Sequence, residues 1–418
     1  MKLTDLKKEI QKYQYMEDTG VIDFTLATII SNRLKLENPV WAIIIGASSG
    51  GKSQILRPMS LTDTKFIHRV DDLTENTFLS GSAGKDDKSL LTREGGIGKH
   101  GMISISDLTV LMSKSAESRA TILSQFRMLF DGEMIKHSGN QAKPIQWQGY
   151  LGVIAGSTPS IYATFEEVSD MGERFVYYRM RDFDPIKATK LALNRKEFGK
   201  DLDDILSSTY QQYIKELVSK YADEVVPNLP DDIENRIIRI AQFAEIVRTA
   251  IHKDWQGNQD RIPVSAYPMR VAQQLRGIAR SMMLMQHNET GSYDLSEEQL
   301  TIIEWVGYSL ANEEKRATLK LIASLDYDLG VSPQALGDEI GLNTSVSSLI
   351  LDSLTAVKIL KKTGNGVHLR YTMKNEEYHK LVRRIQGIKE TQVIEERDIT
   401  DDEGESLEKS LEGQFNEF

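Results

Sequence analysis

The order of apolar and polar positions divides the chain into two parts. In the N-terminal part short strands alternate with helices, and the C-terminal part is largely helical. Apolar, β-branched runs of a few residues that end at glycine or polar residues predict buried strands of a parallel sheet. Five such strands are expected, at 42–45, 66–70, 102–105, 150–157 and directly after Phe175. Strands that alternate with helices indicate an α/β fold.

Apolar residues at helical spacing predict helices within 1–38, over 115–131 and across most of 186–290. The N-terminal helices either brace a ligand pocket or a neighbouring subunit, or they only pack against the core. The stretch 131–149 has the pattern of a β-hairpin, and 82–99 is rich in Gly, Lys and Asp and is expected to be a loop.

From Glu313 onward the pattern changes to a helix, a helix–turn–helix and a β-hairpin. Gly341 stands near the tight turn, Asn343 caps the second helix, and the hairpin is expected to turn at 363–366. This order predicts a winged-helix domain, which either binds DNA or makes protein contacts. The second helix has Ser and Thr but no Arg, which argues against sequence-specific DNA recognition. The modest positive charge of the whole winged-helix domain comes from Lys358, Lys361, Lys362, His368 and Arg370.

The stretch with the most specific chemistry follows the first strand and reads GASSGGKS. It matches G-x-x-x-x-G-K-[ST] through Gly46, Gly51, Lys52 and Ser53. Glycines let backbone N–H groups curl around phosphates, the following helix points its positive end at them, and Lys52 reaches the β- and γ-phosphates. Ser53 is expected to bind Mg²⁺. The predicted ATP-contacting residues here are Gly46, Ala47, Ser48, Ser49, Gly50, Gly51, Lys52, Ser53 and Gln54.

Polar groups at the ends of later strands suggest further parts of this site. Asp107 stands just after the third strand, where it either holds Mg²⁺ or caps a helix. Ser157 and Thr158 end the fourth strand and are expected to touch the γ-phosphate or the attacking water. Water activation is assigned to Glu75 or Asp71, beyond the second strand.

Two arginines are candidates for stabilising transition-state charge. Arg174 precedes the fifth strand and either reaches the ATP of a neighbouring subunit or forms a local salt bridge with Glu173 or Asp170. Arg270 opens an amphipathic helix and is the favoured phosphate-sensing arginine of a helical lid.

Composition limits the classes of protein. With 418 residues, the chain is long enough for two to three domains, and its lack of cysteine excludes disulfides and thiol chemistry. No apolar run is long enough to span a membrane, so a cytoplasmic protein is expected. Residues 390–418 carry eleven acidic and two basic side chains, which leaves only about −1 of the net charge of −10 for the rest. This tail either docks a replication partner or keeps the protein soluble.

Together these parts resemble AAA+ ATPases, and most of all the MCM-like helicases of phages and mobile elements. The resemblance rests on GASSGGKS, ISISD, VIAGSTP, GERF, PMRVAQQL and the C-terminal winged helix, and covers about 40–375. It implies that Arg174 is the arginine finger and Arg270 the second sensor. In a ring, the 131–149 hairpin either points Lys136, His137 or Lys143 into a central pore or forms a solvated turn. Two features depart from the family: Leu108 replaces the usual catalytic Glu, and no large N-terminal DNA-binding domain or zinc module is present.

The resemblance implies an ATP- and Mg²⁺-dependent, hexameric DNA helicase acting on single-stranded or forked DNA in phage or mobile-element replication, located in the host cytoplasm if phage-encoded. The alternative is a replication initiator or helicase loader that switches its assembly on DNA without translocating. The expected divisions are an N-terminal helical segment at 1–38, an ATPase core at 39–185, a helical lid at 186–290, a winged-helix domain at 300–375 and an acidic disordered tail at 388–418.

Overall fold

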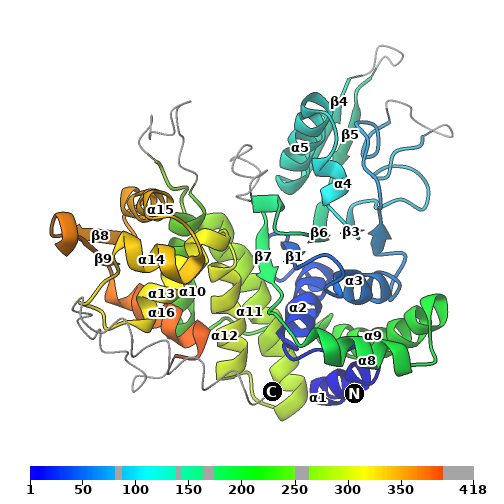
Figure 1. Ribbon diagram of the computed structural model, residues 1–418. Coiled ribbons are helices and arrows are strands. Elements are labelled where there is room, and N and C mark those ends of the chain that lie inside the picture. The colour runs from blue at the N-terminus through cyan, green and yellow to red at the C-terminus, as the bar shows by residue number, and fades with distance from the viewer. Residues whose placement is uncertain (81–86, 138–142, 163–173, 250–262, 389–418) are drawn as a thin grey trace.

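A computed structural model describes residues 1–80, 87–137, 143–162, 174–249 and 263–388. Its centre is a five-stranded, fully parallel sheet in the order β2-β3-β6-β1-β7, flanked by many helices, as expected for an α/β fold (Figure 1). The strands are β1 (Trp41–Ile45), β2 (Ile67–Arg69), β3 (His100–Ile105), β6 (Tyr150–Ser157) and β7 (Val176–Arg179). Each coincides with one of the five predicted strands to within a few residues.

Helices cover both faces of the sheet. On one face, Phe24 of α2 (Gly20–Leu34) stacks on Tyr178 of β7 with ring centroids 5.2 Å apart. On the other, Phe126 of α5 (Ala116–Phe130) packs against Trp41 of β1 at 5.5 Å. Tyr178 pairs with Ile44, three positions beyond Trp41, and side chains alternate along a strand, so the two contacts lie on opposite faces. The sheet is therefore buried on both sides, which explains its near-continuous apolar strands.

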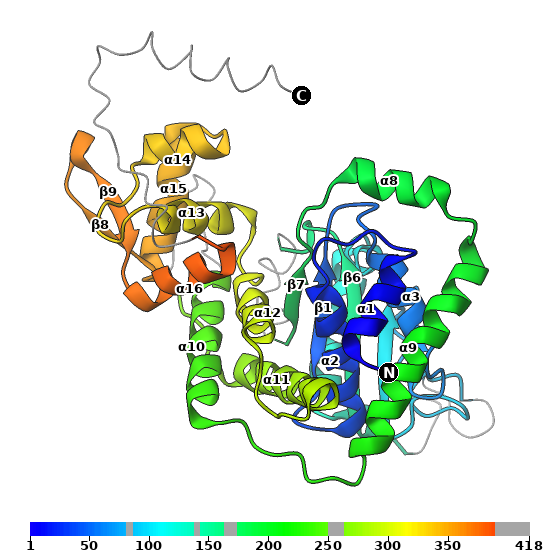
Figure 2. The same ribbon diagram turned by 90° about the horizontal axis from the view of Figure 1, so that it is seen from below.

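The remaining elements of the N-terminal part surround the sheet and the helices that cover it (Figure 2). Helices α1 (Leu3–Gln11), α3 (Lys52–Ser60), α8 (Pro185–Asn194) and α9 (Gly199–Tyr221) lie on the α2 side. In Figure 1 the short α4 (Thr109–Met112) lies between α5 and the strands of the sheet, and the antiparallel hairpin β4 (Glu133–Lys136) and β5 (Ile145–Gln148) lies beside α5. The hairpin was predicted, although its connecting residues 138–142 lie outside the described residues.

Three long helices link the sheet to the C-terminal part. They are α10 (Asp231–Arg248), α11 (Met269–Thr290) and α12 (Glu297–Tyr308). Helix α11 packs along α2, and α12 packs against the edge strand β7 and against α10. Helix α12 was not predicted, although the capping box between Ser296 and Gln299 marks its start.

The C-terminal group lies beside these helices, away from the sheet (Figure 1). It contains α13 (Glu313–Ser324), α14 (Pro333–Ile340), α15 (Thr344–Ala356), the antiparallel pair β8 (Leu360–Thr363) and β9 (Arg370–Met373), and α16 (Glu376–Gln386). Gly341 ends α14 with a φ of 70°, and the Asn343 side chain caps α15, as predicted. The predicted hairpin is present as the β8–β9 pair, but its connection is longer than the predicted 363–366, because it runs over 364–369 and includes a 3₁₀ turn at Gly366–His368.

Across the described residues, no helix is both long and apolar enough to cross a membrane. The acidic tail, 389–418, lies outside the described residues.

Candidate nucleotide-binding site

The loop between β1 and α3 has the backbone shape that its sequence predicts. Ser49 and Gly51 adopt left-handed conformations with φ of 61° and 85°, and the Gly50 N–H donates to the Ala47 carbonyl at 3.1 Å. A left-handed residue beside right-handed ones turns successive N–H groups toward the same side of the chain. Helix α3 begins directly afterwards at Lys52, so its positive end adjoins the loop. The loop thus forms a concave anion site.

The Lys52 side chain is folded into this loop. Its Nζ donates hydrogen bonds to the carbonyls of Gly46 at 2.9 Å and Ala47 at 2.6 Å, and the residue is only 8% exposed. Burial lowers the pKa of Lys52, while the negative charge of Asp107 favours its protonated form. A half-desolvated ammonium held only by neutral carbonyls gains strongly from an added anion.

Strand register brings the other polar residues to the same edge of the sheet. Ile45 at the end of β1 pairs with Ser157 on β6, and Ile105 on β3 pairs with Ala155. Strand β6 therefore lies between the loop strand and the strand that precedes Asp107. The predicted cluster of Lys52, Asp107 and the end of β6 is thus brought together by the sheet.

The contacts of Asp107 are compatible with both of its predicted roles, the helix cap and the Mg²⁺ ligand. Its Oδ1 accepts hydrogen bonds from the Thr109 N–H at 2.9 Å and the Thr109 hydroxyl at 2.6 Å, as in a helix cap. Its Oδ2 accepts no hydrogen bond from any residue that the structure describes. One oxygen orients the carboxylate and the other is available to a cation.

The end of β6 presents two hydroxyl groups. Ser157 is fully buried, and its Oγ has no hydrogen-bond partner among the described residues. The Thr158 hydroxyl lies 2.7 Å from that of Ser160. A buried hydroxyl without a partner beside an anion site is suited to bind a ligand oxygen or an ordered water.

The two candidate bases differ in position. Asp71 lies beside the strand end, where its Oδ1 accepts from the Ser106 hydroxyl at 2.9 Å. Burial raises the pKa of Asp71, but hydrogen bonds from Arg69 and Ser106 outweigh it and hold the pKa below its usual value. Glu75 lies four residues further along an exposed loop, and its backbone carbonyl accepts from Gln125 at 2.8 Å. The structure thus brings Asp71, rather than Glu75, to the edge that contains Asp107.

A cavity of about 500 Å³ opens beside the loop. It is lined by 46–51 and Gln54, by 13–18 between α1 and α2, by 180–183 after β7, and by one face of α8. The N-terminal segment is tied to the loop, because the Gln14 side chain donates to the Gln54 carbonyl at 2.5 Å. The segment between the two N-terminal helices therefore lines the cavity, while α2 itself is buried in the core.

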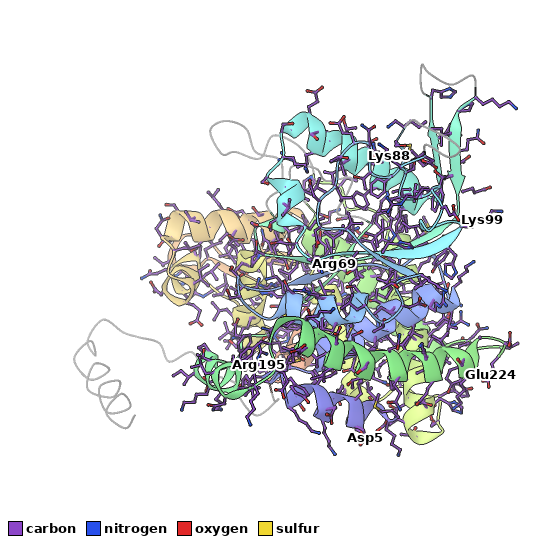
Figure 3. All side chains as sticks on the ribbon, turned by 90° about the vertical axis from the view of Figure 1, so that its right-hand side faces the viewer. Asp5, Arg69, Lys88, Lys99, Arg195 and Glu224 are labelled. Atoms are coloured by element: carbon purple, nitrogen blue, oxygen red, sulfur yellow. The ribbon has the colours of Figure 1, made fainter. Side chains whose placement is uncertain are left out.

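Several cavity residues were not identified from the sequence. Tyr15 and Phe183 meet edge to face with ring centroids 6.4 Å apart. Arg181 lines the same cavity, as does Arg195, whose Nη1 donates to the Tyr13 carbonyl at 3.1 Å. Figure 3 shows Arg195 at the end of α8, well separated from Arg69 on the edge strand β2. No local motif marks these residues, since three segments distant in sequence form this wall.

These residues fit a magnesium-bound nucleoside triphosphate. The loop supplies N–H groups and Lys52 for phosphates, and the cavity has room and two aromatic rings for a base and a sugar. Among the described residues, no cluster of three or more His, Asp or Glu could hold a metal alone. Mg²⁺ usually takes one or two protein ligands together with phosphates and water, and Ser53 and Asp107 could supply those two.

The two candidate arginines lie elsewhere. Arg174 precedes β7 and therefore lies at the amino ends of the strands, whereas the loop lies at their carboxyl ends. Its Nη2 lies 3.8 Å from a carboxylate oxygen of Asp131, and its guanidinium lies 5.9 Å from the centre of the Phe130 ring. Arg270 lines a cavity of about 380 Å³ with Phe130 and Asp131 at this same end of the sheet. Arg270 is therefore not part of the loop cavity of its own chain. Glu173 and Asp170, the predicted local partners of Arg174, lie outside the described residues.

Comparison with protein-family models and with curated proteins finds no match for this chain. The assignment of a function therefore depends on the sequence motifs and the geometry described above.

Proposed function

We propose that this protein is an ATP-hydrolysing, oligomeric DNA helicase of the MCM-like AAA+ type that acts in phage or mobile-element DNA replication. The observation that carries this proposal is the combination of the anion-binding loop, the buried Lys52 and the cavity of about 500 Å³ beside them. ATP and Mg²⁺ are the expected cofactors. Lys52 would hold the β- and γ-phosphates, and Ser53 and Asp107 would hold the Mg²⁺ that neutralises developing charge.

The order of the strands supports the AAA+ assignment. The strand that ends at Ser157 and Thr158 lies between the Lys52 strand and the Asp107 strand, so a hydroxyl group stands between the phosphate site and the metal site. From this position the hydroxyl would contact the γ-phosphate or the attacking water. Asp71, at the next strand end, would orient that water, which offers an alternative to Glu75 where Leu108 replaces the usual acid.

The location of Arg174 supports a shared site. It lies with Arg270 at the amino ends of the strands, while the loop is at their carboxyl ends, so neither arginine reaches the phosphates of its own chain. In an oligomer, this end of one subunit's sheet would face the loop of the next, and Arg174 and Arg270 would complete the neighbour's site. Head-to-tail contacts of this kind can close into a ring, and the resemblance to MCM-like helicases implies a hexamer.

The C-terminal group supports contact with DNA. The helices α13, α14 and α15 and the β8–β9 pair have the order of a winged helix, and Lys358, Lys361 and His368 are exposed on it. Such exposed cations bind phosphates without reading sequence. At the other hairpin, Lys136 donates to Asn76 and to the Leu79 carbonyl, both at 2.7 Å, so this lysine is held within its own chain.

One observation favours the alternative, an initiator or loader that switches assembly without translocating. The exposed face of α15 carries Val346 and Leu349, which are 38% and 46% exposed, beside Thr344 and Ser345. An apolar, uncharged face is better suited to a protein than to DNA phosphates. The winged helix would then hold a partner protein.

The deciding experiment is ATP-dependent strand separation on a forked duplex, with the wild type beside Lys52→Ala. A motor unwinds the fork as wild type and fails as Lys52→Ala. DNA-stimulated ATP hydrolysis without unwinding would instead support the initiator or loader, and absence of ATP hydrolysis would reject both.

A further inference from the structure

A second polar cavity, of about 350 Å³, lies at the end of β7. Its wall is formed by 179–182 from β7 and the segment after it, by Trp305 and Tyr308 of α12, by one face of α13, and by Gln386 at the end of α16. It therefore lies where the sheet, the linking helices and the C-terminal group meet (Figure 1).

Cations outnumber anions in this wall. Arg179 is the last residue of β7 and Arg181 follows that strand, while Arg316 and Lys320 lie one turn apart on α13. The acidic side chains that line the cavity are Asp182 and Glu313. Four cations facing two carboxylates leave a net charge of about +2 before any ligand binds.

The carboxylates do not satisfy these cations. Glu313 is shared, because its Oε2 lies 2.7 Å from Arg179 Nη2 and 3.5 Å from Arg316 Nη2. Lys320 forms no ion pair with any described residue. The Arg181 guanidinium lies over the Trp305 ring, 4.4 Å from its centre, and its Nε lies 3.8 Å from Asp18 Oδ2, which is at the long end of the range for an ion pair.

Hydrogen-bond donors are also left over. Arg316 is 8% exposed, and its Nε has no partner among the described residues; the same holds for the buried Nη1 of Arg179. Burial lowers the pKa of Arg316, and the neighbouring Arg179 adds to this effect. Buried guanidinium groups with free donors are costly unless an anion pairs with them.

We propose that this cavity binds a phosphate group, supplied either by a nucleic-acid backbone or by a free phosphate compound. Guanidinium groups present their N–H donors as a planar fork that matches phosphate oxygens, and two such forks with a nearby ammonium form a phosphate site. The cavity exceeds the size of one phosphate, so it has room for a second phosphate or for the attached sugar.

This site adjoins the loop cavity but is distinct from it. Met180, Arg181 and Asp182 line both cavities, and the Met180 N–H donates to the Ile45 carbonyl at 2.8 Å, directly before the loop. A phosphate bound here would draw on Arg181 and shift a wall of the nucleotide cavity. Occupancy of one cavity is therefore expected to change affinity in the other.

The test uses the full chain with Lys52→Ala in every variant, so that phosphate binding at the loop is weakened throughout and the result does not depend on ATP hydrolysis. Pyrophosphate and a short oligothymidylate are titrated separately, with the unfolding midpoint and tryptophan fluorescence as readouts, because Trp305 lines the cavity. The test variants are Arg181→Gln/Lys320→Gln, both exposed positions that should fold, and Arg316→Lys. The matched control is Lys380→Gln, an exposed lysine on α16 outside the cavity.

We expect saturable binding of at least one probe, weakened about tenfold or more by Arg181→Gln/Lys320→Gln and unchanged by Lys380→Gln. Binding of pyrophosphate alone identifies a free phosphate compound as the ligand, and tighter binding of the oligonucleotide identifies a nucleic-acid backbone. No saturable binding of either probe, or equal binding by the double variant and the control, would overturn the proposal.

Discussion

The proposed division of the ATP site between two subunits can be tested by mixing inactive variants. Arg174 is two residues before Val176, which pairs with Ala42, so it is level with Val40, the residue directly before the neighbouring strand β1. Gly46 is six residues further along the same direction. At about 3.3 Å per residue, the two levels are about 20 Å apart, beyond the reach of an arginine side chain.

We therefore expect Lys52→Ala and Arg174→Ala each to lose turnover when assembled alone. Loss of a charge-stabilising arginine lowers the rate by about 10³–10⁵-fold. In a mixed oligomer, a site with Lys52 from one subunit and Arg174 from the next is complete. Random mixing at equal amounts makes about one quarter of all sites complete, so turnover should return to about a quarter of wild type.

The assay is steady-state ATP hydrolysis after co-assembly, with oligomer size measured in parallel. The matched control mixes Lys52→Ala with a Lys52→Ala/Arg174→Ala double variant, in which no site can be complete. Because Arg174 is 7% exposed, Arg174→Lys is tested beside Arg174→Ala to separate loss of packing from loss of the guanidinium. Full activity of assembled Arg174→Ala, or no recovery on mixing while oligomers form, would refute the shared site.

Three further outcomes are expected. Gly152→Ala should destabilise the protein by about 1–3 kcal/mol in chemical denaturation, because its Cβ would lie 2.4 Å from the buried Asn32 side chain, and unchanged stability would contradict this packing. Burial raises the pKa of Asp23 to about 6 despite Lys7, so the folded carboxyl keeps a proton that the unfolded chain has lost. Stability should fall by about 3 kcal/mol as pH rises from about 4 to about 6, and Asp23→Asn should flatten that slope in urea denaturation; equal slopes would reject the assignment. Deletion of 390–418 should leave ATP turnover unchanged, and loss of turnover would show that the tail is more than a docking or solubility element.

Strands and motif chemistry were predictable because their signals are local. The apolar runs before Gly46 and Asp107 are bounded by glycine or polar residues, and the glycine spacing of the loop fixes its backbone shape. Register then follows from parallel pairing, which brings Ser157 level with the end of β1. The strands and the loop shape needed no knowledge of tertiary contacts, whereas the register between β1 and β6 is itself a long-range contact.

The cavity walls were not predictable, because they depend on how distant segments pack. Tyr15 precedes α2 and Phe183 follows β7, so the contact between them depends on the packing of α2 against the sheet. The position of Arg270 depends on the start of α11, which is held by Gln274. The Gln274 side chain accepts a hydrogen bond from the Trp41 N–H at 2.8 Å and donates one to the Arg174 carbonyl at 3.1 Å. Those two bonds bring α11 to the end of the sheet opposite the loop, where sequence spacing alone could not place it.

The same contacts give the nucleotide cavity a physical route to the C-terminal group. The Trp305 indole N–H on α12 donates to the Arg179 carbonyl at 2.7 Å, at the end of the strand beside the loop strand. On the same helix, the fully buried Glu304 binds Arg236 of α10 at 2.9 Å and Arg384 of α16 at 2.8 Å. A buried carboxylate that loses one of two cationic partners is strongly destabilised, so α10, α12 and α16 are expected to move together. A displacement of the end of β7 is therefore expected to reach the C-terminal group through Trp305 and Glu304 of α12.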